Sequence, residues 1–152
     1  MYKIPERRNE HDVGMITALS TINWLAVGLA TIASFVLGAL WFTPLFGRQW
    51  DRSLGIERRK GDRYPLLYYV VPLVSSLLMA IATAVLVDAI GIDGLADAAL
   101  LGLVVGVGYS AAVTVTNAVT PVTPHPLMFA LITGSYHVVG AVASAIIIVA
   151  MR

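Results

Sequence analysis

Apolar residues run along this chain in long stretches that only short polar segments interrupt. Residues 13–47, 64–87 and 98–151 contain no permanently charged side chain. A helix needs about 20 apolar residues to cross roughly 30 Å of hydrocarbon, so the first two stretches each hold one span and the third holds two. The sequence therefore predicts an all-α fold, a four-helix transmembrane bundle, with spans at about residues 22–43, 65–87, 98–119 and 127–150.

Prolines mark where these helices begin, bend and end. Pro44 lacks an amide hydrogen and clashes with the preceding turn, so the first span should end or kink there. Pro65 suits the start of the second span, and Pro72 is placed to bend its first half. Three prolines within residues 120–126 separate the third span from the fourth.

A short amphipathic segment follows the first span. Phe46, Trp50 and Leu54 recur every four residues, which places them on one helix face, with charged residues on the other faces. This pattern favours a short interfacial helix lying in the membrane surface, and a loop with an interfacial tryptophan is the alternative. The interfacial signature of this exit consists of Trp41, Pro44, Phe46 and Trp50.

The first 20 residues differ from the rest of the chain. Residues 1–12 carry three basic and three acidic side chains, and residues 13–20 are uncharged but mixed in polarity. We expect residues 1–20 to form a polar N-terminal tail with a helical lead-in at the membrane interface. Residues 21–151 then form the four-span membrane domain, and Met15 is an alternative start of the natural chain.

Composition agrees with a membrane protein and excludes several other classes. Of the 152 residues, 58% are hydrophobic and 12% are charged, whereas soluble domains contain about 25% charged residues. A net charge of +1 provides no concentrated basic face for a nucleic acid. The chain has no cysteine, and it lacks the HExxH, Walker and GxSxG motifs. We therefore expect no cofactor, no metal site and no catalytic residue.

Positive charge is concentrated in one loop. Residues 47–64 contain six Lys or Arg residues, the connector 88–97 contains none, and the N-terminal tail contains three. Because an excess of Lys and Arg stays cytoplasmic, we expect this basic loop in the cytoplasm and both termini outside. The loop also predicts contacts with anionic lipid headgroups, and a purely topological role is the alternative. The candidate lipid contacts are Arg58, Arg59, Lys60 and Arg63.

The last two spans carry small and polar residues at alternating steps of three and four, which places them on one face of each helix. If the hairpin turns near residue 123, these faces meet, because helices in lipid associate through small residues and hydrogen bonds. The segment GLVVG at 102–106 also fits a homodimer motif, and packing within the chain is the alternative. The predicted packing seam pairs Gly102 with Ser144, Gly106 with Gly140 and Tyr109 with His137.

His137 is the one strongly ionisable residue well inside a predicted span. An ionisable group near the bilayer midplane marks a functional site by default. A neutral histidine bonded to Tyr109 or Thr133 is the structural alternative. Asn117 lies nearer the basic loop, so Asn117, Tyr109 and His137 form a candidate polar path. A proton-driven transporter would hold a carboxylate inside a span, and this sequence has none there.

Two blocks of the sequence resemble a known family. The first block combines NWL at 23–25 with GALWFTPLFGRQW at 38–50, and the second combines TNAV at 116–119 with GSYHVVG at 134–140. These blocks resemble the small prokaryotic integral membrane proteins catalogued as domain of unknown function 1761. The resemblance implies a four-helix protein of the prokaryotic plasma (inner) membrane with no established activity.

Together these patterns predict a multi-pass membrane protein that is not an enzyme. We expect a non-enzymatic subunit that acts through self-association or as part of a larger membrane complex, with the bilayer and anionic lipids as further partners. The alternative is an oligomeric permeation or transport unit for a small neutral or weakly charged solute. Acid/base chemistry at His137 would need a second positioned titratable group, which makes an enzyme the weakest hypothesis.

Overall fold

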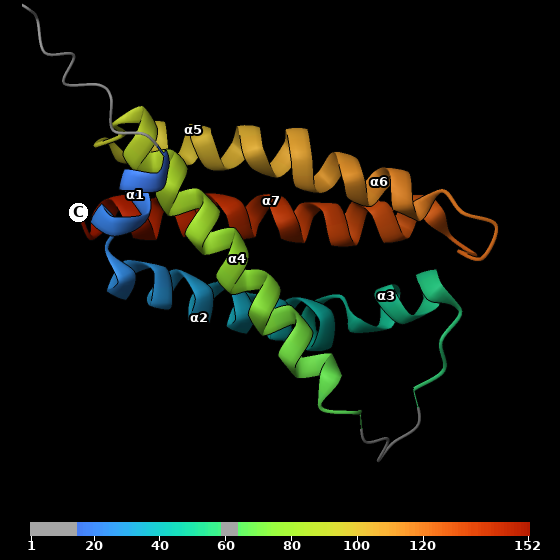
Figure 1. The fold of residues 1–152 in the computed structure, drawn as a ribbon. Helices are drawn as coiled ribbons and strands as arrows, with labels where there is room; N and C mark the ends of the chain where they lie inside the picture. Colours follow the sequence, from blue (N-terminus) through green and yellow to red (C-terminus); the bar gives the residue numbers. More distant parts are fainter. Residues whose placement is uncertain (1–14, 59–63) are drawn as a thin grey trace, which may run out of the picture.

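Four helices long and apolar enough to cross a membrane make up most of the chain (Figure 1). The structure is a computed structural model that describes residues 15–58 and 64–152. Within these residues it contains helices and no strand, which confirms the predicted all-α four-helix bundle. The spanning segments are Trp24–Leu45, Leu67–Ile90, Leu95–Ala118 and Pro126–Ala150.

The first span begins at an asparagine cap. A short helix, α1 (Met15–Thr21), precedes it, in the region where the sequence predicts a helical lead-in. The Asn23 side-chain oxygen then accepts hydrogen bonds from the amides of Leu25 and Ala26, at 3.0 and 3.2 Å. These amides have no partner inside the helix, so the cap stabilises the start of α2 (Trp24–Leu40).

The first span ends at Pro44, as its chemistry predicts. The last turn, η1 (Trp41–Leu45), is a π-helical turn that contains this proline. Gly47 follows it in a place where a side chain would not fit, because a Cβ there would lie 2.9 Å from the Phe42 carbonyl oxygen. The chain turns at this point into α3 (Gly47–Leu54), the short helix that the sequence predicts after the first span.

Glycine and proline also set the limits of the other helices. Gly91 lies in the left-handed region, with φ of 74°, and caps the second span, because glycine adopts this conformation without strain. Pro126 opens the fourth span at the first helical turn, where its missing amide hydrogen is not needed. These spans are formed by α4 (Leu67–Ile90), by α5 (Leu95–Val105) with η2 (Gly106–Ala111) and α6 (Ala112–Ala118), and by α7 (Pro126–Ala150).

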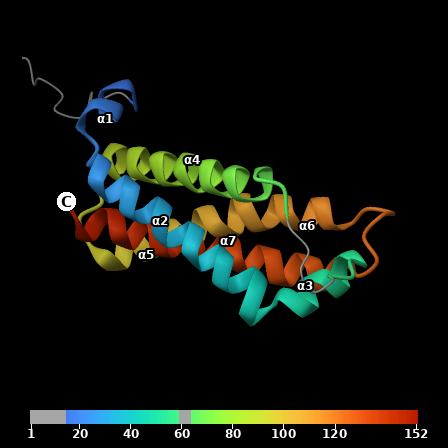
Figure 2. The ribbon, with the colours of Figure 1, turned by 90° about the horizontal axis from the view of Figure 1, so that it is seen from below.

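The fourth span is the central helix of the bundle. α7 packs against α5 and α6 on one side and against α2 on the other, and α4 crosses obliquely over α2 and α7 (Figures 1 and 2). The core between the helices consists largely of alanine, which lets helix axes approach closely in lipid. Its fully buried alanines are Ala26, Ala30, Ala80, Ala98 and Ala145.

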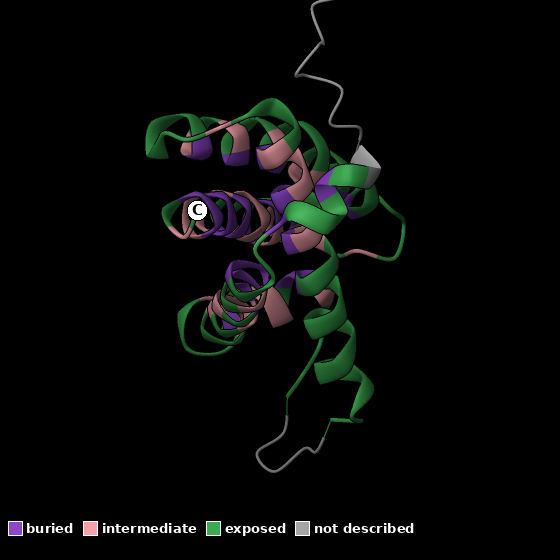
Figure 3. Ribbon diagram, turned by 60° about the vertical axis from the view of Figure 1, so that its left-hand side comes forward, coloured by how far each residue is buried: buried purple, intermediate pink, exposed green. Residues whose placement is uncertain are grey.

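The first half of α4 stands apart from this core. Every residue from 64 to 75 is exposed, and the first buried residue is Ser76. Figure 3 shows this half of α4 as an exposed arm that extends away from the buried interior. The second half packs against α2 and α7 through Ala80, Ala84 and Val87. The second half of α4 is therefore packed against the bundle, while its first half is exposed on the surface.

Candidate functional site

Aromatic side chains gather where the first span meets α7. The ring centroids of Trp41 and Phe46 lie 4.9 Å apart, and those of Phe42 and Trp50 lie 5.5 Å apart. Tyr136 of α7 lies 5.0 Å from Phe42 and 6.4 Å from Trp41. These distances are in the range in which aromatic pairs attract each other. We call these five residues the aromatic junction, because they join the end of the first span and α3 to the central helix.

Hydrogen bonds to backbone carbonyls hold the aromatic junction in place. The Trp41 Nε1 donates to the carbonyl oxygen of Ile132 at 3.0 Å, and the Tyr136 hydroxyl donates to the carbonyl oxygen of Ser34 at 3.4 Å. Gly38 makes room for the tyrosine, since a Cβ there would lie 3.0 Å from the Tyr136 hydroxyl. The glycine, the tryptophan and the tyrosine therefore fit together as one packing unit between α2 and α7.

Three residues of the interfacial signature also take part in packing, and their position at the membrane interface stays a prediction. Trp41, Phe46 and Trp50 contact other aromatic rings of the junction, while Pro44 is exposed in the η1 turn. The sequence reasoning gave no role to Tyr136, although it lies within the second block of the family resemblance. The position of Tyr136 in that block was the sequence signal that could have identified it. In the fold, Tyr136 of the second block contacts Trp41 and Phe42 of the first block.

The predicted packing seam is present in part, in a different register. A Cβ on Gly102 would lie 2.5 Å from the Val142 Cα, and one on Gly106 would lie 2.8 Å from the Val138 Cα. These glycines therefore face the α7 backbone and do not meet Ser144 or Gly140. The third span ends at residue 118 and α7 begins at residue 126, so the hairpin is centred on residue 122, not on 123. Because paired residue numbers add up to twice the number of the central residue, this shift moves the α7 partner of each residue by two positions.

Two members of the predicted seam lie elsewhere. The Ser144 Oγ is buried and lies 3.0 Å from the Ser34 Oγ, so this serine joins α7 to α2, not to α5. Gly140 is buried, but a Cβ on it would have no neighbour within 4 Å. The close approach on α7 therefore involves Val138, Ala141 and Val142, none of which the sequence pattern indicates.

The predicted contact between Tyr109 and His137 is wrong. Tyr109 is 72% exposed, and no hydrogen bond joins it to His137 among the described residues. Tyr109 lies in η2, and a π-helical turn is wider than an α-helical turn, so it rotates the following residues away from the predicted face. Thr114 and Ala118 continue the buried face instead. The prediction assumed a regular helix through this point.

The candidate polar path is not assembled within one chain. His137 is half-buried, with its ring centroid 5.0 Å from that of Tyr136, and Asn117 and Tyr109 are exposed on the third span. The Thr133 hydroxyl, the other predicted partner of His137, is buried without a hydrogen-bond partner in the part of the chain that the structure describes. The three path residues therefore do not line a common cavity of the single bundle.

A pocket of about 450 Å³ lies beside α3, at the end of the bundle that carries the basic loop. Arg58 lines the pocket and pairs with Asp51 at 2.8 Å. The other predicted lipid contacts, Arg59, Lys60 and Arg63, lie outside the described residues. We call this the arginine pocket, and its lining residues are Thr43, Gly47, Arg48, Asp51, Arg52, Ile56 and Arg58.

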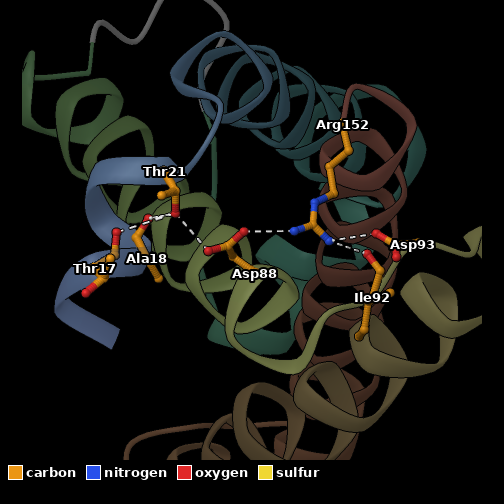
Figure 4. Close-up of polar contacts among 7 residues, drawn as sticks. All are labelled: Thr17, Ala18, Thr21, Asp88, Ile92, Asp93 and Arg152. Atoms are coloured by element: carbon orange, nitrogen blue, oxygen red, sulfur yellow. Dashed lines mark hydrogen bonds and ion pairs between the residues drawn. The ribbon is translucent and has the colours of Figure 1, made fainter. Parts of the chain in front are cut away.

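A polar network holds the other end of the bundle together (Figure 4). The Arg152 guanidinium donates to the Asp88 carboxylate at 2.8 Å, and to the Ile92 carbonyl and the Asp93 carboxylate at 2.7 and 3.1 Å. The Thr21 hydroxyl donates to the second oxygen of Asp88 at 2.8 Å. Asp88 therefore connects α1 to the end of α7. This terminal polar network gives the acidic connector a structural role that the sequence analysis missed.

Replacing Asp88 with asparagine should lower the free energy of unfolding by about 1 kcal/mol, because a partly exposed ion pair and its hydrogen bonds contribute about that much. The Asp88 side chain is only 20% exposed and contacts two elements. Asp93 is 88% exposed, so Asp93→Asn should change stability by less than about 0.5 kcal/mol. Thermal unfolding at low and high salt measures both variants. Equal effects would contradict the assigned role of Asp88.

The geometry defines the class of protein. Three spanning helices pack around the fourth, α7, with an aromatic junction and an arginine pocket at one end and a polar network at the other. This is the arrangement of a small multi-pass helical membrane protein. Among the described residues, no three His, Asp or Glu side chains come together in a way that could hold a metal ion.

The particular family is shown by comparison with family models. The chain belongs to DUF1761, described as a protein of unknown function, whose model matches residues 25–149. This finding confirms the resemblance that the two sequence blocks indicate. No curated protein and no solved structure matches the chain.

Proposed function

We propose that this protein is a non-enzymatic subunit of the prokaryotic plasma membrane that acts by associating with further copies of itself. The observation that carries this proposal is the position of Tyr109. It is the fifteenth residue of the 24-residue span Leu95–Ala118, about 4 Å along the helix axis from the middle of the span. At this depth in a bilayer, water is absent and acyl chains accept no hydrogen bonds.

An exposed phenol at this depth needs a partner. Tyr109 is 72% exposed, and within the described residues no hydrogen bond to its hydroxyl is present. A hydroxyl placed in hydrocarbon without a hydrogen bond is unfavourable by several kcal/mol, on the order of 4 or more. A second subunit that packs against this face provides the missing acceptor and removes the hydroxyl from the acyl chains.

The surface around Tyr109 suits close packing. Gly108 lies next to it, and a Cβ on Gly108 would meet no atom within 4 Å, so the backbone there is open to an approaching helix. Small residues that expose the backbone are typical of contact faces between membrane helices. The rest of the outer face of this span is apolar and exposed. Its large residues are Leu100, Leu103, Val104, Val107 and Val113.

The GLVVG segment is not available for this association. Gly102 and Gly106 are already packed against the backbone of α7, so their face is covered within the chain. Self-association therefore uses the opposite face of the third span, the one that carries Tyr109. The exposed first half of α4 offers additional apolar surface of the kind that a neighbouring subunit covers.

The mass of the purified particle tests the proposal. Native mass spectrometry in mild detergent should show a multiple of the 16.2 kDa chain. Tyr109→Phe keeps the ring and removes the hydroxyl, and it should weaken association by roughly 3-fold to 20-fold, the range expected for one hydrogen bond between membrane helices. Tyr69→Phe is the matched control. Tyr69 is also exposed, but it lies at the start of α4, where a hydroxyl can reach the headgroups.

Two results would contradict the proposal. A wild-type particle with the mass of one chain at every protein concentration excludes self-association. Equal weakening by Tyr109→Phe and Tyr69→Phe shows that the contact does not depend on the midplane hydroxyl. Co-purification of a different membrane protein with a monomeric chain would point to a larger complex and would likewise overturn self-association.

The proposal includes an orientation. The described part of the basic loop, residues 47–58, lies at one end of the bundle, and α1, the acidic connector and Arg152 meet at the other end. Because cytoplasmic loops carry the excess of Lys and Arg, we propose that the basic loop is cytoplasmic and that both termini are outside. The accessibility of a cysteine introduced at Glu57 to a membrane-impermeant reagent measures this orientation.

A further inference from the structure

The arginine pocket has an excess of positive charge. Three arginines and one aspartate line it. Asp51 is paired with Arg58, and within the described residues Arg48 and Arg52 have no carboxylate partner. These two arginines are four residues apart on α3, which places them on the same face of the helix. The pocket therefore presents two guanidinium groups on one face of α3, and neither is paired with a carboxylate of the described residues.

The third arginine is fixed in position. The Arg58 Nε bonds to the Asp51 carboxylate, and its guanidinium carbon lies 5.8 Å from the Trp50 ring and 5.9 Å from the Tyr64 ring. Arg58 Nη2 is 3.4 Å from the carbonyl oxygen of Phe42. Contacts of this kind, an ion pair and two cation–π interactions, hold a guanidinium before any ligand arrives. The pocket is thus partly preorganised.

The pocket lies beside the end of the first span, where a spanning helix reaches the headgroups. It is formed by α3, which directly follows the end of the first span, together with Thr43 of η1. Two aromatic residues of this region, Phe46 and Trp50, belong to the aromatic junction, which ties α3 to α7 at the end of the membrane-length helices. The volume of about 450 Å³ is in the range of small-ligand sites.

We propose that the arginine pocket binds the phosphate group of an anionic glycerophospholipid from the leaflet on the basic-loop side. Guanidinium groups bind phosphate oxygens with paired, charge-assisted hydrogen bonds, and Arg48 and Arg52 supply two such groups. The site is a folded pocket on α3, distinct from the linear run of basic residues that the sequence offers for lipid contact. Its lipid is held at one place on the protein, not by diffuse attraction to the membrane surface.

The first experiment compares lipids on the wild-type protein. The full chain is purified in mild detergent, incubated with equal amounts of phosphatidylglycerol and phosphatidylcholine, and analysed by native mass spectrometry for retained lipid. We expect phosphatidylglycerol to be retained at least 10-fold more than phosphatidylcholine, with one molecule per chain saturating first. Glycerol 3-phosphate and inorganic phosphate, added as soluble competitors, should displace it only at much higher concentration.

The second experiment moves one charge without changing the net charge. The double variant Arg52→Gln with Gln49→Arg keeps the charge of α3 but places it at a residue that does not line the pocket. It should retain at least roughly 10-fold less phosphatidylglycerol, as expected for the loss of a charge-assisted contact. The double variant Arg48→Lys with Arg52→Lys keeps both charges but lacks the paired hydrogen bonds that a guanidinium group makes. Its retention of phosphatidylglycerol should lie between that of the wild type and that of the charge-relocation variant. Far-UV circular dichroism checks that each variant is folded.

Each contrary result overturns the proposal. Equal retention of the two lipids by the wild-type protein excludes a preference for the anionic headgroup, and this test requires no variant. Wild-type retention by the charge-relocation variant shows that only diffuse attraction acts. If glycerol 3-phosphate or inorganic phosphate saturates the pocket at concentrations at which the lipid does not bind, the pocket takes a soluble phosphate and not a lipid.

Discussion

Replacing Gly102 with alanine is expected to lower the free energy of unfolding by about 3 kcal/mol, the upper end of what overpacking usually costs. The added Cβ would lie 2.5 Å from the Val142 Cα and 2.8 Å from both the Ala141 carbonyl oxygen and the Val142 nitrogen. These are backbone atoms of the central helix, so no side chain can rotate away to make room. α5 and α7 must separate, and they lose close contacts along their length.

Two other glycines provide controls on neighbouring helical surface. Gly108 lies in the same span and Gly140 lies in α7, and a Cβ on either would meet no atom within 4 Å. In the dissociated chain, alanine at these positions should leave stability unchanged or raise it by up to about 1 kcal/mol, because alanine favours a helix over glycine. The sequence pattern places Gly140 in the packing seam and would predict a loss of stability for Gly140→Ala. The expected difference in stability between Gly140→Ala and Gly102→Ala therefore depends on the observed register.

Unfolding by sodium dodecyl sulfate in mixed micelles, followed by far-UV circular dichroism, measures all three variants on one scale. A stability of Gly102→Ala within 1 kcal/mol of the wild type would show that α5 and α7 are not in close backbone contact. Destabilisation by Gly140→Ala that matches that of Gly102→Ala would restore the register predicted from the sequence and contradict the observed one.

The membrane spans could be predicted from the sequence because their cause is local. A stretch of apolar residues of the right length becomes a spanning helix through the chemistry of its own side chains and of the bilayer. Pro44 likewise ends the first span through its own ring, and Asn23 caps α2 through its own side chain. Features of this kind depend on residues within a few positions of one another.

The packing of the spans could not be predicted in the same way. The close approach of Gly102 and Gly106 to α7 is predicted correctly, but their partners depend on where the loop between the helices begins and ends. The exposure of Tyr109 depends on one π-helical turn, which no local sequence signal indicated. A small error in the assumed rotation per residue adds up along a helix. Residues far from the first residue of a predicted face are therefore the most easily assigned to the wrong side.

The candidate sites at the two ends of the bundle depend on contacts distant in sequence. Arg152 and Asp88 are 64 residues apart, and Tyr136 and Ser34 are 102 residues apart. Pairs so far apart along the chain leave no periodic pattern within a single sequence. The sequence groups Trp41, Phe46 and Trp50 because they lie close together along the chain, but the tyrosine that Trp41 contacts becomes apparent only when the fold places α2 beside α7.

Tyr136→Ala is expected to lower the free energy of unfolding by about 3 kcal/mol, as for the truncation of a packed aromatic side chain. Its ring contacts Trp41, Phe42 and His137, and its hydroxyl fills the space beside Gly38. Truncation removes these contacts and leaves a void between α2 and α7. Tyr136→Phe keeps the ring and loses the hydroxyl with its bond to the Ser34 carbonyl, so it should cost about 1 kcal/mol.

An exposed tyrosine of the same membrane domain, Tyr109, supplies the contrast. Tyr109→Ala removes a side chain that is 72% exposed in its own chain, so the stability of the dissociated chain should change by less than about 0.5 kcal/mol, while association weakens. Unfolding measured at several protein concentrations separates the two effects, because only a loss of association depends on concentration.

If Tyr136→Ala unfolds at the same denaturant level as the wild type, the aromatic junction does not hold α2 to α7. If Tyr109→Ala destabilises the dissociated chain as strongly as Tyr136→Ala, then Tyr109 is buried within the bundle, and both the outward rotation at the π-helical turn and the proposed self-association through that face are wrong.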